Sequence, residues 1–163
     1  MLKLSKLADY ATVLMTLIAR DGERVHTGQE LAERSGVPAP TVAKLLKALA
    51  RGELLHSLRG AHGGYRLARP AEKISVADII AALEGPIGVT ECSSQPGGCT
   101  LESACSTRAN WRLINIAIRQ ALEAVTLAQM AIPHTAAQAK AREESVLTFH
   151  RGPRSSANPS STA

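Results

Sequence analysis

Three features of the sequence predict a mainly α-helical protein with a winged helix-turn-helix, a small β-hairpin wing and a long C-terminal helix suited to dimerisation. Two short amphipathic segments are joined by a tight turn at Ser35-Gly36. Two short apolar strands around a glycine-rich loop follow directly. Apolar residues then recur at helical spacing over 108–131. The 163 residues suffice for one domain of ordinary size.

Composition and charge restrict the classes of function. Hydrophobic residues make up 45% of the chain but aromatic residues only 2%, which leaves little surface for stacking sugars or aromatic ligands. The formal net charge is +5. Residues 1–70 hold 11 Lys and Arg against 6 Asp and Glu, whereas residues 71–131 hold 4 against 6. We therefore expect an anionic partner to bind the first part of the chain.

The first two helices have clear start and stop signals. Ser5 can cap a helix that ends at Asp21-Gly22, and its apolar stripe is Leu7, Tyr10, Ala11, Leu14 and Ile18. Thr27 and Glu30 form a capping-box pattern at the start of the second helix. Gly36 suits the left-handed end of that helix.

The third helix carries a cationic outer face. Pro40 fits its first turn, where a missing N–H costs nothing. The periodicity turns one set of residues toward the core: Val42, Leu45, Leu46 and Leu49. The outward set is Thr41, Ala43, Lys44, Lys47 and Arg51. A short helix, a glycine turn and a second helix of this kind predict a helix-turn-helix.

A β-hairpin is expected directly after the third helix. Leu54–Leu58 and Tyr65–Ala68 are the predicted strands, and the loop between them is rich in glycine and carries Arg59. Scattered lysines often mark only a solvated helix face, and glycines a loose turn. The combination of helix-turn-helix and wing favours double-stranded DNA as the partner. The expected DNA contacts are Thr41, Lys44, Lys47, Arg51, Arg59, Gly60, His62 and Tyr65.

These contacts are expected to differ in kind. Lys44 can reach base edges in the major groove, whereas Lys47 and Arg51 suit phosphate contacts, which position without specifying. Arg59 suits a narrow minor groove. His62 is equally explained as a loop histidine with no role.

All three cysteines lie in the irregular segment 90–107, after a connecting helix within 71–89 that Ser75 and Asp78 cap. The spacing of Cys92, Cys99 and Cys105 is C-x6-C-x5-C, with three soft thiolates within fourteen residues. This pattern suits an iron–sulfur cluster, either [2Fe-2S] or [4Fe-4S]. Zinc, a thiol sensor and plain buried cysteines stay open as alternatives.

A four-coordinate set needs a ligand beyond the three cysteines. Glu91, Glu102, Asp9 from another segment or subunit, water or an external thiol are the candidates, and spacing does not choose among them. An odd number of cysteines excludes a complete internal disulfide framework. We expect a cytoplasmic protein, because thiols stay reduced there.

The segment 108–131 is predicted as a dimerisation helix. Its apolar seam is Trp111, Ile114, Ile118, Leu122 and Val125. A lone helix with such a seam needs a covering surface, and a second copy would also present two DNA-reading heads. Residues 132–163 have few large apolar groups, and their composition predicts a disordered tail.

Several functions have no support in the sequence. No stretch reaches the roughly 18 apolar residues that a membrane span needs. No nucleophile elbow, phosphate-binding glycine loop or metalloprotease histidine pair occurs, and the five histidines are scattered. We expect no membrane partner, no catalysis and no small-molecule substrate.

The chain resembles the winged-helix iron–sulfur transcription regulators of the IscR and NsrR type over about residues 1–131. The resemblance rests on Leu4-Ser5-Lys6-Leu7-Ala8-Asp9-Tyr10-Ala11, on Arg59-Gly60-Ala61-His62-Gly63-Gly64-Tyr65 and on the three-cysteine loop. Within the family the chain is most similar to regulators of SUF iron–sulfur assembly operons. That similarity rests on Leu83-Glu84-Gly85-Pro86, Thr90-Glu91-Cys92 and Arg108-Ala109-Asn110-Trp111-Arg112.

The resemblance implies a homodimer that crosses through the long helix, with Cys92, Cys99 and Cys105 as cluster ligands. It also implies a regulator, expected to be a repressor, of SUF-type genes that responds to iron–sulfur or redox status. Arg108 stands where IscR-type members have a histidine, so a histidine-ligated [2Fe-2S] centre is not implied. Asp9 stands where NsrR-type members complete the set from the partner subunit, although it also suits an ordinary first-turn acid.

The chain departs from the IscR-type pattern in its third helix, and two alternative functions stay open. Pro40, Ala43 and Lys44 stand where IscR-type members have polar readers, so their DNA motif does not transfer. A zinc- or thiol-based DNA-binding redox switch is the first alternative function. An iron–sulfur carrier or scaffold is the second, although a carrier has little use for a wing and a cationic helix.

Overall fold

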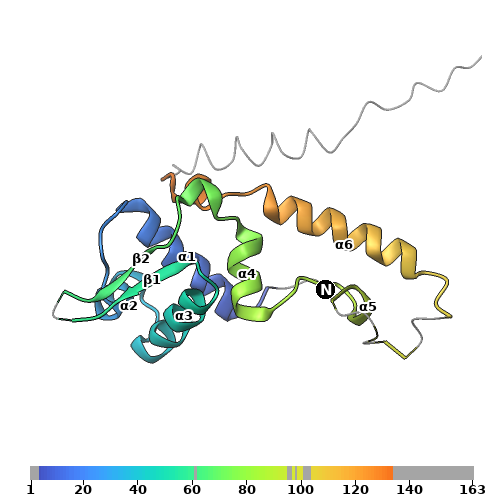
Figure 1. Ribbon diagram of the computed structural model, residues 1–163, viewed down its shortest axis with the longest axis horizontal. Helices are drawn as coiled ribbons and strands as arrows, with labels where there is room; N and C mark the ends of the chain where they lie inside the picture. Colours follow the sequence, from blue (N-terminus) through green and yellow to red (C-terminus); the bar gives the residue numbers. More distant parts are fainter. Residues whose placement is uncertain (1–3, 61, 95–96, 98, 101–103, 134–163) are drawn as a thin grey trace, which may run out of the picture. The chain divides into compact units, whose positions relative to one another are not determined.

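The computed structural model describes residues 4–60, 62–94, 97, 99–100 and 104–133 (Figure 1). The predicted tail falls outside these residues from position 134 onward. The described elements, which belong to one unit that ends at Ile132, are α1 (Lys6–Arg20), α2 (Gly28–Ser35), α3 (Ala39–Arg51), β1 (Leu55–Leu58), β2 (Gly64–Leu67), the 3-10 turn η1 (Ala71–Lys73), α4 (Val76–Glu84), α5 (Glu91–Ser94), α6 (Arg108–Glu123) and α7 (Leu127–Ala131). The predicted winged, mainly helical fold is confirmed.

Helices α1, α2 and α3 pack around a shared apolar core. The Ser5 hydroxyl accepts a hydrogen bond from Ala8 N at 3.1 Å, and Gly36 ends α2 with a φ of 72°. The start of α1 and the end of α2 are therefore as the sequence predicts. The four inward residues predicted for α3 are all buried, and the core they share with α1 and α2 includes Ala11, Leu14, Met15, Ile18, Leu31, Val42, Leu45, Leu46 and Leu49.

Two details of these helices differ from the prediction. Ala11, Leu14 and Ile18 of the predicted stripe of α1 are buried, together with Ala8 and Met15, but Leu7 is 37% exposed. Only half of the capping box of α2 forms: Thr27 accepts from Glu30 N at 3.2 Å, but the Glu30 carboxylate faces neighbouring cationic side chains. Glu30 therefore links side chains around the α1–α2 turn.

The wing is a two-stranded antiparallel hairpin, in which β1 pairs with β2 from Leu55↔Leu67 to Leu58↔Gly64. An isolated antiparallel β-bridge ties it to the segment before α2, since His26 N donates to Tyr65 O at 2.9 Å and Tyr65 N donates to His26 O at 2.8 Å. A Cβ on Gly64 would lie 2.4 Å from His26 O. Glycine at position 64 thus permits the wing to dock on the helix-turn-helix.

Helix α4 joins this domain to α6. Ser75 and Asp78 form the predicted capping box, and Ile79 and Ile80 are buried. Leu83 is only partly buried against the core. Helix α4 contacts α1, α3 and α6, so it connects α3 to α6.

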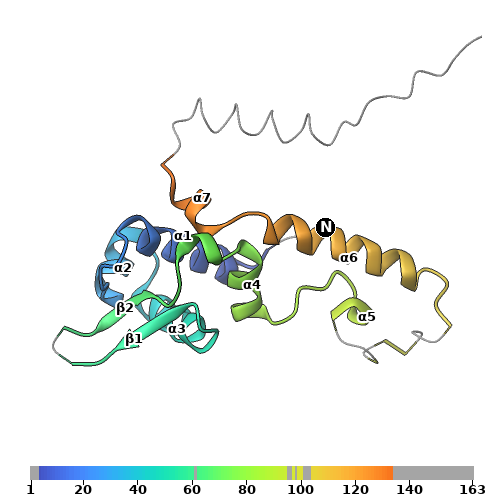
Figure 2. The same ribbon diagram turned by 45° about the horizontal axis from the view of Figure 1, so that its top comes forward.

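The prediction of one continuous helix over 108–131 is wrong. Helix α6 ends at Glu123, and a capping box of Thr126 and Gln129 starts α7 (Figure 2). Val125 O accepts from Val76 N at 2.9 Å, and Leu127 N donates to Ile74 O at 2.7 Å. Leu127 is fully buried and α7 contacts α1. The chain turns at 124–126 because the cap and this burial compete with helix continuation.

Candidate nucleic-acid interface and cysteine site

One groove brings together the cationic face of α3 and the wing. Its lining residues are Lys44, Lys47, Ala50, Arg51, Ser57 and Tyr65. Four of the predicted DNA contacts therefore share one surface. Sequence reasoning missed Ser57, although it pairs with Tyr65 in the hairpin register. Thr41 is half-buried and does not line this groove.

The cations of this surface lack acidic partners. Lys44, Lys47, Arg51 and Arg59 form no ion pair with any carboxylate in the described part of the chain, whereas five arginines elsewhere do: Arg24, Arg34, Arg66, Arg69 and Arg119. An unpaired guanidinium or ammonium group is available to phosphate without first losing a salt bridge. The charge distribution thus favours the α3 and wing surface for an anion.

The tip of the wing is a tight exposed turn. Gly63 N donates to Gly60 O at 2.9 Å, and Gly60 has a φ of 104°, which favours glycine. Arg59, Gly60 and His62 are all exposed. The predicted wing contacts are therefore accessible.

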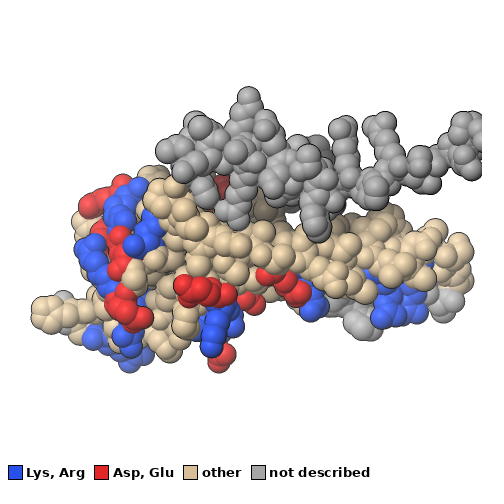
Figure 3. All heavy atoms as spheres, turned by 90° about the horizontal axis from the view of Figure 1, so that it is seen from above, with Lys and Arg blue, Asp and Glu red and all other residues tan. Residues whose placement is uncertain are grey.

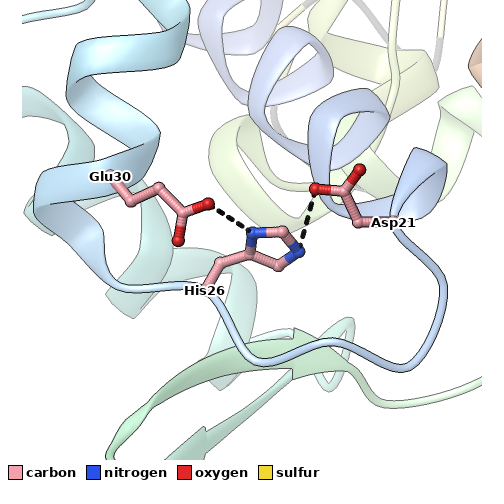
Figure 4. Close-up of side chains that lie close together, drawn as sticks. All are labelled: Asp21, His26 and Glu30. Atoms are coloured by element: carbon pink, nitrogen blue, oxygen red, sulfur yellow. Dashed lines mark ion pairs between the residues drawn. The ribbon is translucent and has the colours of Figure 1, made fainter.

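A buried histidine network lies behind the helix-turn-helix (Figure 4). The ring of His26 is 0% exposed, with Nε2 3.7 Å from Asp21 Oδ2 and Nδ1 3.6 Å from Glu30 Oε1. Arg34 Nη1 lies 2.6 Å from Asp21 Oδ2, and Arg24 Nη2 lies 3.0 Å from Glu30 Oε1. The Arg34 hydrogen bond lowers the pKa of Asp21 below its ordinary value.

We interpret this network as one that stabilises the fold and not as a metal site. Asp21, His26 and Glu30 offer ligand atoms within 4.8 Å of one another. However, the two ring nitrogens face different carboxylates, and guanidinium groups already neutralise both. The sequence signal that was missed is the i, i+4 spacing of His26 and Glu30 across the start of α2.

The cysteine segment lies between α4 and α6. Cys92 is on α5, and Cys99 and Cys105 are in irregular backbone; all three are free thiols of intermediate exposure. Asn115 of α6 holds the residues just before the segment, because its Oδ1 accepts from Val89 N at 3.2 Å and its Nδ2 donates to Ile87 O at 3.3 Å. The segment is thus tied to α6.

Threonines contact two of the cysteine sulfurs. Thr90 Oγ1 lies 3.3 Å from Cys92 Sγ, and Thr107 Oγ1 lies 3.3 Å from Cys105 Sγ. The hydroxyl and backbone N–H of Thr107, with a smaller contribution from Arg108, lower the pKa of the Cys105 thiol. A lowered pKa increases the thiolate fraction, the form that binds metal and reacts.

The segment offers three thiolates and no histidine, which is the soft donor set typical of iron–sulfur clusters. Tetrahedral zinc would bring thiolate sulfurs to about 3.8 Å from one another. Among the described residues, only Asp21, His26 and Glu30 form a group of three with ligand atoms within 4.8 Å, so the three cysteines do not. A [4Fe-4S] cluster binds each thiolate at a different iron atom and needs no such proximity, whereas a [2Fe-2S] cluster held by three cysteines places two of them on one iron.

The structure describes two of the three carboxylates that were proposed as ligands beside the cysteines. Asp9 is exposed near the start of α1, and Glu91 is exposed at the start of α5. Glu102 lies outside the described residues. Asp9 is therefore accessible to a second chain.

Helix α6 buries none of its residues within the protomer. Trp111 and Ile114 of the predicted seam are exposed, Ile118 and Leu122 are half-buried, and Val125 lies beyond the end of the helix. Figure 3 shows an uncharged band over α6 with charged side chains along its edge. Leu113 and Ile116 add exposed apolar surface that the seam did not include.

No helix in the described ranges is long and apolar enough to cross a membrane.

Comparisons with known proteins agree with this geometry. The family model Rrf2, described as an iron-dependent transcriptional regulator, matches residues 4–132. Protein rrf2 of Nitratidesulfovibrio vulgaris is 33% identical over 130 residues, which cover 79% of this chain and 87% of that protein. The HTH-type transcriptional regulator IscR of Sodalis glossinidius is 30% identical over 135 residues, which cover 79% and 78%.

Two solved structures are also similar. CymR, described as the global cysteine regulator of B. subtilis, has a TM-score of 0.63 and 29% identity, covering 80% of this chain and 97% of that chain. IscR of T. potens has a TM-score of 0.61 and 31% identity, covering 88% and 90%.

Proposed function

Because the chain belongs to the Rrf2 family, whose members are transcriptional regulators and not enzymes, we propose that it is a dimeric, DNA-binding repressor of SUF-type iron–sulfur assembly genes. Cys92, Cys99 and Cys105 hold an iron–sulfur cluster through which the protein senses iron–sulfur or redox status. The match to a model described as iron-dependent supports a metal-responsive function. The SUF assignment rests on the sequence stretches around Gly85, Cys92 and Trp111.

The observation that carries DNA binding is the groove between α3 and the wing. Lys44 and Lys47 project from one face of α3 and Tyr65 faces the same groove from β2. Lys44 reads base edges, while Lys47 and Arg51 neutralise phosphates. Arg59 extends the contact at the wing tip, where its charge suits a narrow minor groove.

The exposed face of α6 supports dimerisation. A sixteen-residue helix with no fully buried residue in its own protomer gains limited stability from tertiary packing. A second copy covers this seam and places two reading heads on one DNA duplex. Leu4, Leu7 and Val13 on and before α1 add exposed apolar surface to the protomer.

The position of the cysteine segment supports a link between sensing and DNA binding. The segment follows α4, which contacts the DNA-reading helix α3, and precedes α6. When bound, the cluster supplies a one-electron redox centre whose presence depends on iron and sulfide. The three cysteine ligands are restrained relative to one another in that state. This restraint shifts the population between two placements of the α3 helices, which changes operator affinity.

A thiol-based redox switch is the second candidate function. The lowered pKa of Cys105 favours it, because thiolates are the reactive form of cysteine. Metal analysis distinguishes the two functions. A carrier or scaffold function gains no support from the α3 and wing groove, and transfer of a cluster without DNA affinity would be its signature.

DNA binding is tested by selecting genomic fragments with the anaerobically purified protein and titrating the recovered sequence by fluorescence anisotropy at fixed salt. Lys44→Ala with Arg59→Ala is expected to weaken binding by tenfold or more, since each lost contact costs about 1–3 kcal/mol. Lys73→Ala with Arg119→Ala removes the same charge elsewhere and serves as the control. Equal affinity of the two double variants would contradict the assigned surface.

A further inference from the structure

Two cysteines of the proposed cluster have a hydroxyl group against the sulfur. The Thr90 hydroxyl precedes Cys92 by two residues, and the Thr107 hydroxyl follows Cys105 by two residues; both oxygen–sulfur distances are 3.3 Å. The two threonines stand at opposite ends of the segment, one before α5 and one before α6. A contact between a threonine hydroxyl and a cysteine sulfur therefore occurs twice, in two different backbone settings.

Thr107 contacts the sulfur instead of capping its helix. Thr107 is the N-cap residue of α6, yet its side chain makes no capping hydrogen bond. The hydroxyls at four other N-caps each accept a backbone N–H: Ser5, Thr27, Ser75 and Thr126. A capping hydroxyl stabilises a helix terminus, so its use at Cys105 points to a role at the sulfur.

A neighbouring hydroxyl supports the orientation of Thr90. Ser93 Oγ lies in short contact with Thr90 Oγ1. A hydroxyl can accept one hydrogen bond while it donates another. Thr90 can therefore accept from Ser93 and donate to Cys92.

We propose that Thr90 and Thr107 are positioning residues that donate hydrogen bonds to the Cys92 and Cys105 thiolates and raise the reduction potential of the cluster that these thiolates hold. This inference rests on the proposed function. A metal-bound thiolate has no proton, so the hydroxyl must be the donor. Reduction adds one electron and breaks no bond, and a donated hydrogen bond stabilises the more negative reduced state more than the oxidised state.

The test compares Thr90→Val and Thr107→Val with wild type in an anaerobic spectroelectrochemical titration of the holoprotein. Valine keeps the shape of threonine and removes the hydroxyl. Each variant is expected to shift the midpoint potential downward, and the double variant is expected to shift it further. Thr90→Ser and Thr107→Ser retain a hydroxyl and should restore the wild-type potential. Thr100→Val is the control, because Thr100 adjoins Cys99 but makes no hydrogen bond to a described cysteine sulfur.

The outcomes separate this inference from the cluster itself. Wild-type protein without a cluster would overturn both proposals. A wild-type cluster with unchanged potential in both valine variants, or an equal shift in Thr100→Val, would overturn only the role of the hydroxyls. Cluster loss in the valine variants with retention in the serine variants supports that role. Cluster loss in the serine variants as well contradicts it.

Discussion

Arg34 Nη1 lies 2.6 Å from Asp21 Oδ2, and this contact joins the end of α1 to the last turn of α2. The same carboxylate oxygen faces Nε2 of the buried His26 at 3.7 Å. The turn between α1 and α2 is therefore held by charged groups around the buried imidazole of His26, and not only by the apolar core.

The first prediction concerns pH. Because Arg34 lowers the pKa of Asp21, this aspartate stabilises the fold above its unfolded pKa, and the contribution is lost as the pH falls through the lower folded pKa. Asp21→Asn should lower the thermal unfolding midpoint at pH 7, and the difference from wild type should shrink below about pH 4. Glu23→Gln, at a side chain 97% exposed, is the control. The same difference at both pH values would contradict the account.

The second prediction concerns the docking of the wing. Gly64→Ala should destabilise the protein by about 1–3 kcal/mol and weaken DNA binding, because the new Cβ would overlap His26 O. Gly28→Ala is the matched control, since its Cβ would lie 3.6 Å from Leu46 Cδ1, an ordinary contact. Its stability should be unchanged or slightly higher. Chemical denaturation and anisotropy measure both effects, and a harmless Gly64→Ala would exclude the close approach.

The third prediction concerns the dimer. Ile114→Glu should convert the protein to monomers in sedimentation experiments, because it places a charge in the proposed α6 seam. Ile116 is exposed to a similar extent, 47% against 43%, but lies about 160° around the helix from Ile114. Ile116→Glu should leave the dimer intact. Dimers in both variants would place the interface elsewhere.

The fourth prediction concerns sensing. Wild-type protein should bind its operator with different affinities before and after chelation of iron under anaerobic conditions. The variant with Cys92, Cys99 and Cys105 all changed to alanine should show one affinity in both states. Ser106→Ala, from the same segment, should respond like wild type. An iron response that survives removal of all three cysteines would exclude them as the sensor.

Local chemistry made much of this fold predictable from sequence. Ser5, Gly36 and the Ser75–Asp78 pair act where the sequence places them, because a cap involves only neighbouring residues. The break before α7 was missed because Leu122 and Val125 continue the helical spacing up to it. Thr126 and Gln129 carried the contrary signal, and their capping box becomes decisive once Leu127 is buried.

The parts of the candidate site that depend on contacts between distant segments could not be predicted from the sequence. The face of α3 followed from periodicity, so Lys44 and Arg51 were placed correctly on its outer side. The network around His26 joins groups from α2 and from the turn between α1 and α2, and only the folded backbone brings these groups together. The contact of Thr107 with Cys105 was equally invisible, because Thr107 reads in sequence as an ordinary helix cap.

The central claim is that the three cysteines hold an iron–sulfur cluster. Its most direct test is an anaerobic ultraviolet–visible spectrum of freshly purified protein, with iron, acid-labile sulfide and zinc quantified on the same sample. The account predicts a brown protein with visible absorption and sulfide that matches iron. Protein that stays colourless and metal-free after anaerobic reconstitution, or that carries stoichiometric zinc, would contradict it.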